Sequence, residues 1–258
     1  MKHITKILSL LLALTMLLCF PVAVSAAELE DAPIDESRTG SLTIYKYDLT
    51  NAEKDGVWDS SYVSTGVFNQ TGVNDVLGGG SSTLGNGETG YGYAIKGVEF
   101  SYVQVADIVQ FSESENDSRT GSHVEVLYAI DKTIGADFLK ALNLADGKDR
   151  YTNADALDDT KYFYQSDVLI DALAAALESN STVVKNALES YISANGGNAM
   201  PLTDSYGKTQ ATDLALGLYL VVETKVPEMV VSTTDPFLVS VPMPSVNQRH
   251  GRRHPLDL

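Results

Sequence analysis

The segment Gly40-Ser-Leu-Thr-Ile-Tyr-Lys-Tyr-Asp48 carries the clearest strand pattern of the chain. Its side chains are mostly β-branched or aromatic, and they alternate with the period of two that is typical of a half-buried strand. The alternation divides them between two faces, one with Leu42, Ile44 and Lys46 and the other with Thr43, Tyr45 and Tyr47. The pattern therefore predicts a strand here, and it puts a lysine on a face that is otherwise apolar.

Further segments of the same kind follow along the chain. Residues 50–92 are rich in Gly, Ser, Asn and Thr and are predicted to be irregular. Strand patterns then recur over residues 97–105, 123–130, 214–223 and 237–243. The chain therefore contains strands near both of its ends.

The middle of the chain changes to helical periodicity. Leu169, Leu173 and Leu177 recur at helical spacing in an alanine-rich stretch, and Asn195-Gly196-Gly197 supplies a helix end. We expect two or three helices within about residues 135–195. The order of strands, helices and strands favours a mainly β fold, a β-sandwich with a helical insertion, over alternating βαβ units.

The N-terminal segment has the three parts of a secretory signal peptide. Lys2 and Lys6 give a positive start, residues 7–20 form an apolar run, and Val24-Ser25-Ala26 offers small residues for cleavage after Ala26. An uncleaved membrane anchor is the alternative, but the apolar run is short for a full span. Residues 1–26 are therefore predicted to direct export, and the acidic residues 27–37 to form a flexible leader.

The chain is strongly acidic, with a formal net charge of −16. Without Lys2 and Lys6 the 18 Lys and Arg residues become 16 against 34 Asp and Glu, so the net charge becomes −18. This balance argues against nucleic acid and anionic membrane surfaces as partners, because both bind through Lys and Arg. Cys19 is the only cysteine and lies in the signal segment, so the mature chain can form no internal disulfide.

The last residues have a different composition. Residues 245–258 are basic, with three arginines and two histidines in an otherwise acidic chain. They are either a functional patch or sequence that does not belong to the domain, and we favour the second reading. The main domain is accordingly expected to span residues 38–244.

Several patterns suggest catalytic or binding motifs, but none has the flanking elements, partner residues or spacing that the motif requires. Gly85-Asn-Gly-Glu-Thr-Gly90 matches a dinucleotide-binding pattern, but it lacks the preceding strand and the following helix. His123 is the only histidine in the body of the domain, which argues against a catalytic triad and a zinc site. The acidic cluster Glu113-Ser-Glu-Asn-Asp117 lacks the spacing of a calcium loop. We therefore expect no cofactor and no metal.

Lys46 and Glu223 are the two polar residues that the sequence indicates as candidates for a chemical reaction. If the face with Leu42 is the core, Lys46 is buried, and burial favours the neutral, nucleophilic amine. The alternative is that the lysine ends its strand and extends to water. Glu223 closes the apolar run Gly217-Leu-Tyr-Leu-Val-Val-Glu223, so its carboxyl is expected to be desolvated. A neutral amine beside a protonated carboxyl can attack an asparagine amide and release ammonia.

Four segments resemble a known family in order and spacing. They are Thr39-Gly-Ser-Leu-Thr-Ile-Tyr-Lys-Tyr-Asp48, Gly97-Val-Glu-Phe100, Gly217-Leu-Tyr-Leu-Val-Val-Glu-Thr-Lys-Val-Pro227 and Pro236-Phe-Leu-Val-Ser-Val-Pro-Met243. They are similar to the N-terminal domain of Gram-positive, sortase-assembled major pilin subunits, over roughly residues 38–243. The resemblance implies an immunoglobulin-like sandwich in which Lys46 is the isopeptide lysine and Glu223 the catalytic acid.

The chain departs from the family after Pro244. The family has a last strand ending in Tyr-Pro-Lys-Asn, whose lysine sortase joins to the next subunit and whose asparagine pairs with the lysine of the first strand. That motif and a Leu-Pro-x-Thr-Gly sorting signal are missing here, and Asn247 is the only asparagine near the end. We expect the chain as written to be a truncated pilin that lacks the Lys46 cross-link and is secreted without anchoring.

The resemblance implies a structural function. The first hypothesis is a subunit of a pilus that supports cell adhesion, with other subunits and a pilin-type sortase as partners, and with wall anchoring only in the full-length form. It implies no enzyme beyond autocatalytic isopeptide formation. The second is a tip pilin or adhesin whose loops at 50–92 and helices at 135–195 bind a host surface or matrix ligand. A secreted carbohydrate-active protein is the third, but Trp58 is the only tryptophan that could stack on a sugar.

Overall fold

The computed structural model describes residues 34–35, 37–56, 82–83, 89–90, 92–112, 124–228 and 233–242. The chain divides into two compact units, Met1–Ile34 and Asp35–Leu258, and all described residues except Ile34 belong to the second. Several sequence predictions fall outside the described residues. These are the signal peptide with Ala26, most of the leader, the glycine motif at 85–88, the acidic cluster at 113–117, Trp58, His123 and the tail at 245–258.

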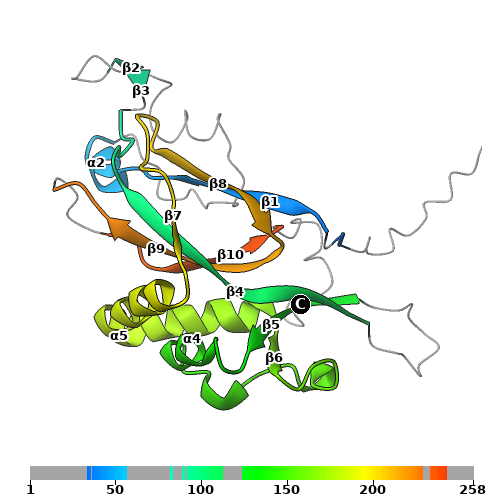
Figure 1. Ribbon diagram of the computed structural model, residues 1–258. Helices are drawn as coiled ribbons and strands as arrows, with labels where there is room; N and C mark the ends of the chain where they lie inside the picture. Colours follow the sequence, from blue (N-terminus) through cyan, green and yellow to red (C-terminus); the bar gives the residue numbers. More distant parts are fainter. Residues whose placement is uncertain are drawn as a thin grey trace, which may run out of the picture. The chain divides into compact units, whose positions relative to one another are not determined.

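The described strands form antiparallel sheets (Figure 1). A small sheet pairs β1 (Thr39–Tyr45) with β8 (Lys208–Ala215). A larger sheet has the order β10 (Phe237–Val241), β9 (Gly217–Lys225), β4 (Glu99–Ser112), β5 (Val124–Asp131) and β6 (Lys161–Tyr164). The short strand β7 (Asn198–Ala199) also pairs with β4, and β2 (Ser82–Thr83) pairs with β3 (Thr89–Gly90). The predicted mainly β fold is confirmed.

The core of the sandwich lies between the two sheets. The small sheet contributes Leu42 from β1 together with Ala211 and Leu214 from β8. The larger sheet contributes alternate residues of its strands, among them Phe100, Tyr219, Val221 and Val241. Leu42 is buried and Ile44 packs against the same cluster, as the alternation of their strand predicts.

The helical insertion is confirmed and lies between β5 and β7 in the chain. It contains α4 (Ala136–Ala141), the 3₁₀ turns η1 (Ala145–Gly147) and η2 (Thr152–Ala154), and α5 (Ser166–Ala194). Helix α5 contacts β4, β9 and β10, and Figure 1 shows it lying along the larger sheet. Leu169 and Leu173 are buried and Leu177 is half-buried, so their helical spacing does mark the packed side.

Helix α5 changes direction at Asn180. This residue has φ −160° and ψ 74°, which is extended backbone inside a helical segment. Its side-chain oxygen accepts a hydrogen bond from the N–H of Val183 at 3.4 Å. Asn180 therefore ends one helical stretch and caps the next. No helix in the described part of the chain is long and apolar enough to cross a membrane.

Three elements differ from the sequence prediction. The strand β6 lies inside the region predicted as helical. Its four residues are too few to show a periodicity, so the sequence pattern did not indicate it. Helix α2 (Leu49–Lys54) extends into the region predicted as irregular, and the Asp48 side chain caps its start by accepting a hydrogen bond from the Asn51 N–H. The single strand predicted at 214–223 is two strands, β8 and β9. The inward side of β8 carries Thr209 and Ala211, which show little apolar contrast.

The packing of α5 gives a direct test of the insertion. Leu188 is fully buried, whereas Val183 on the same helix is 59% exposed. We expect Leu188→Ala to lower the free energy of unfolding by about 2–5 kcal/mol, because it leaves a cavity in the core. Val183→Ala should change it by less than about 0.5 kcal/mol. Urea unfolding of both variants measures the difference, and equal effects would contradict the packing described here.

Candidate functional site

Lys46 follows directly after β1 and is fixed by its backbone. Its N–H donates to the Gly207 carbonyl at 2.8 Å, and its own carbonyl accepts from the Ile95 N–H at 3.0 Å. Gly207 has φ +70°, and a Cβ on it would lie 2.4 Å from the Lys46 carbonyl oxygen, so this close approach needs glycine. The Lys46 side chain is only 13% exposed. It therefore turns inward and does not extend into solvent.

Glu223 lies on β9, the strand whose residues are buried on both faces. Every residue from Gly217 to Glu223 is buried, and the Glu223 side chain is 0% exposed. Tyr219 and Val221 belong to the core between the sheets, so alternation places Glu223 on that same face. Phe100 of β4 is its partner in the ladder. The sequence prediction of a desolvated glutamate at the end of an apolar strand is thus correct in its burial.

The structure brings the two predicted residues together. Lys46 Nζ lies 2.7 Å from Glu223 Oε2, although 177 residues separate them in the chain. Thr234 completes the group: its N–H donates to Glu223 Oε2 at 3.0 Å, and its Oγ1 accepts a hydrogen bond from Lys46 Nζ. The sequence analysis missed Thr234, because only the pairing of distant strands places it here.

One oxygen of this group has no partner in the part of the chain that the structure describes. Glu223 Oε1 is buried and accepts no hydrogen bond from the described residues. A buried carboxyl oxygen without a donor costs about 1–3 kcal/mol or more. The arrangement therefore favours a further donor at Oε1.

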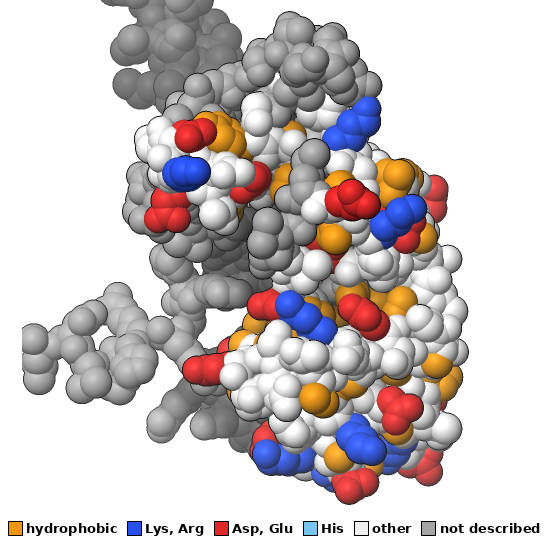
Figure 2. Space-filling view, turned by 90° about the vertical axis from the view of Figure 1, so that its left-hand side faces the viewer, with side chains coloured by type: hydrophobic (Ala, Val, Ile, Leu, Met, Phe, Trp, Pro, Cys, Tyr) orange, Lys and Arg blue, Asp and Glu red, His pale blue; other side chains and the backbone are white. Residues whose placement is uncertain are grey.

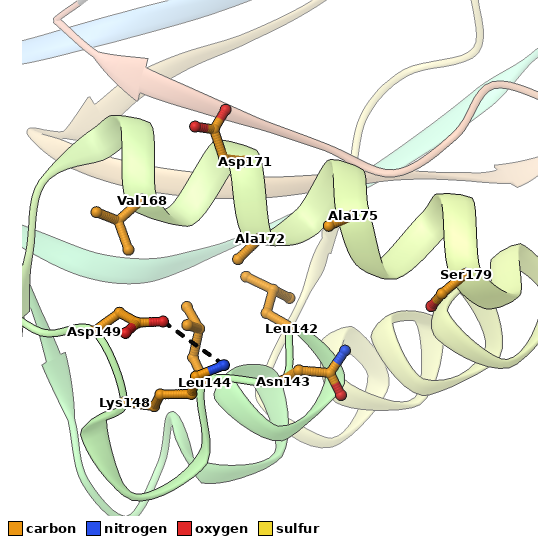
Figure 3. A pocket seen from close by; sticks show the side chains of 10 residues that line it. All are labelled: Leu142, Asn143, Leu144, Lys148, Asp149, Val168, Asp171, Ala172, Ala175 and Ser179. Carbon is orange, nitrogen blue, oxygen red and sulfur yellow. Dashed lines mark ion pairs between the residues drawn. The ribbon is translucent and has the colours of Figure 1, made fainter.

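A second feature is a pocket in the helical insertion (Figure 3). It has a volume of about 520 Å³ and lies between the segment 142–149 and the first half of α5. Its apolar lining includes Leu142 and Ala172, and Lys148 and Asp149 form a 3.8 Å ion pair at one side. Both charged side chains are more than half exposed, so no buried polar group defines a ligand here. Within the described residues, no group of three His, Cys, Asp or Glu side chains could hold a metal ion.

The charged side chains are mixed over the surface seen in Figure 2. Lysines and arginines lie among aspartates and glutamates, and the apolar side chains are scattered. An extended apolar patch would mark a protein interface, and this face shows none among its described side chains.

Comparisons with known proteins give weak matches. No protein-family model matches the chain, and no curated protein sequence matches it. Two solved structures are similar: the full-length RrgB pilus protein of Streptococcus pneumoniae at 14% identity and a structure of the pilus backbone RrgB from the same organism at 13%. Each match covers 57% of this chain and only 22% or 31% of the other, with a TM-score of 0.20. At that TM-score the likeness supports no argument about fold or function.

The buried pair predicts strong coupling between Lys46 and Glu223. We expect Lys46→Met and Glu223→Leu each to lower the free energy of unfolding by about 3–5 kcal/mol, since each leaves one polar partner buried alone. The double variant should lose clearly less than the sum of the two, because it removes both partners. Urea unfolding measures this cycle on protein whose intact mass is that of the uncross-linked chain.

An exposed ion pair on the same chain is the control for that cycle. Lys148→Met breaks the pair with Asp149, whose side chains are 63% and 61% exposed. It should change stability by less than about 1 kcal/mol. Strict additivity of the Lys46 and Glu223 variants would show that the two side chains do not interact in solution.

Proposed function

We propose that this chain is part of a structural subunit of a Gram-positive pilus, and that in the full-length subunit Lys46 forms an intramolecular isopeptide bond with an asparagine under catalysis by Glu223. The observation that carries the proposal is the buried contact between Lys46 and Glu223. An amine and a carboxyl that are held together in an apolar core have the chemistry that such a bond requires.

The four segments that resemble major pilins also lie together in space. They correspond to β1, the start of β4, β9 and β10, and β9 pairs with both β4 and β10 while β1 contacts β10. Two of the segments also meet at their ends: Gly97 has φ +90°, and a Cβ on it would lie 3.5 Å from the Pro227 ring. The resemblance therefore follows one connected part of the fold around Lys46 and Glu223.

The proposed reaction balances within the chain. The neutral Lys46 amine attacks the Cγ of an asparagine side chain and forms a new N–C bond. Protonated Glu223 donates to the amide and polarises it, and the proton that the amine loses returns through Glu223 to the leaving nitrogen. The old C–N bond breaks and one ammonia leaves. Glu223 Oε1 accepts no hydrogen bond from the described residues, which supports this role, because it is the oxygen that can face the amide.

A covalent bond of this kind suits a subunit that carries tension. The only cysteine is Cys19, in the predicted signal peptide, so the mature domain has no disulfide of its own. A Lys–Asn bond from the first strand closes a long loop of chain. It therefore lowers the conformational entropy of the unfolded state, as a disulfide does. We further propose that other subunits and a pilin-type sortase are its partners, and that it acts on no substrate outside its own chain.

The bond itself is tested by mass spectrometry. In the full gene product from the cells that encode it, we expect a digest peptide with Lys46 joined to an asparagine-containing peptide, lighter by one ammonia. Fragment spectra then identify the asparagine and decide whether it is Asn247. Glu223→Ala should abolish the joined peptide, whereas Glu178→Ala, on the exposed side of α5, should leave it. A joined peptide at wild-type level in Glu223→Ala would contradict the role of Glu223.

Polymerisation is tested on the cell surface. An antibody against residues 38–242 should detect a ladder of high-mass bands in wall extracts that resists boiling in SDS. Deletion of the pilin-type sortase gene should reduce the ladder to a single subunit band. One band of subunit size in both strains would contradict the structural subunit, and glycan or matrix binding by the isolated domain would then support the adhesin.

A further inference from the structure

Thr234 touches both reacting groups of the proposed site. It lies in the segment 233–236, directly before β10. Its N–H donates to Glu223 Oε2 at 3.0 Å, and its hydroxyl oxygen accepts from Lys46 Nζ. Because β10 begins only at Phe237, these bonds are not part of a strand ladder. Their effect is on the orientation of the two side chains.

These bonds select one direction of attack for the amine. A neutral amine has two N–H bonds and one lone pair. With the Glu223 proton on Oε1, Glu223 Oε2 and Thr234 Oγ1 accept the two N–H bonds of Lys46, so the lone pair points away from both. An electrophile can react only along that lone pair. Thr234 thus orients the nucleophile as a substrate-positioning residue does in an enzyme.

The same residue also orients the carboxyl. Both the Thr234 N–H and Lys46 Nζ bond to Oε2 of Glu223, which leaves Oε1 without a partner among the described residues. Glu223 therefore has one oxygen that holds the amine and one that is available to an incoming amide. Without the Thr234 N–H, Oε2 would keep only its contact with Lys46, and the hydrogen bonding of the two oxygens would differ less.

The neighbouring residues hold Thr234 in place. Asp235 Oδ1 lies 2.7 Å from Lys185 Nζ on α5, and the side chains are 62% and 24% exposed. An ion pair this exposed contributes little to global stability. Its position matters more, because it ties the segment 233–236 to the helical insertion. The buried Pro236 restricts the backbone of Asp235 as well.

We propose that Thr234 is a positioning residue for the Lys46 cross-linking reaction and that the Lys185–Asp235 ion pair holds it there, an inference that rests on the proposed function. The helical insertion then has a second purpose. Besides covering the larger sheet, it supports the reacting groups through one ion pair.

The rate of cross-linking tests the proposal. The full gene product is refolded, and the loss of ammonia is followed by intact mass. We expect Thr234→Val to slow the reaction by about tenfold or more, because it removes one bond that orients the amine. Thr234→Ser keeps the hydroxyl and should stay within about threefold of wild type. Lys185→Met and Asp235→Asn should slow it less, and equally, and the double variant should be no slower than either single variant.

A second measurement separates this inference from the proposed function. Hydrogen exchange at Lys46 Nζ is followed in ¹⁵N-lysine-labelled protein whose intact mass is that of the uncross-linked chain, so that it reports the hydrogen bonds of the free amine. It should be faster in Thr234→Val and Lys185→Met than in wild type, and unchanged in the exposed-pair control Lys148→Met. If wild type forms no cross-link, the proposed reaction fails, and the exchange rates alone decide the positioning of Lys46. Unchanged exchange and an unchanged rate in Thr234→Val would overturn the inference.

Discussion

The burial of β9 on both faces is the constraint on which the rest of the structure depends. The strand pairs with β4 on one side and β10 on the other. One of its faces packs against β1 and β8 through the core, and α5 contacts the strand as well. A strand enclosed in this way has to be apolar over its length, and Gly217 to Val222 fulfil that requirement. Any polar group at its end must find its partners inside the protein.

Glu223 is that polar group, and its environment explains why Lys46 lies where it does. A buried carboxylate alone would cost several kcal/mol, and a buried ammonium likewise. Their contact offsets much of this cost, and Thr234 contributes two further hydrogen bonds. Apolar residues of similar size would often stabilise such a position as well or better. Stability alone therefore gives no reason for a polar group here with one oxygen that has no partner among the described residues.

The sequence predicts the strands with strong periodicity and misses those without it. Leu42 and Ile44 alternate clearly, and the residues that flank Glu223 are all apolar, so burial at both places follows from the pattern. The pattern does not reveal β8 as a separate strand, because the inward residues Thr209 and Ala211 show little apolar contrast. Asp213 also has a positive φ of 58° within the strand. Thr234 could not be found by pattern, since its contact with Lys46 spans 188 residues. Periodicity reports what a residue packs against in general, but only the tertiary fold selects the particular partner.

The long separation of these residues also bears on when the proposed reaction can occur. Lys46 reaches its place only when β1 has paired with β8, and Glu223 only when β9 is enclosed by its neighbours. In an unfolded, solvated chain the lysine is an ammonium and the glutamate a carboxylate, and neither is suited to attack an amide. Burial supplies both the proximity and the low-polarity surroundings at the same moment. Under the proposed function, the covalent bond would therefore form only in a domain that has already folded correctly, so that tension is resisted by native subunits alone.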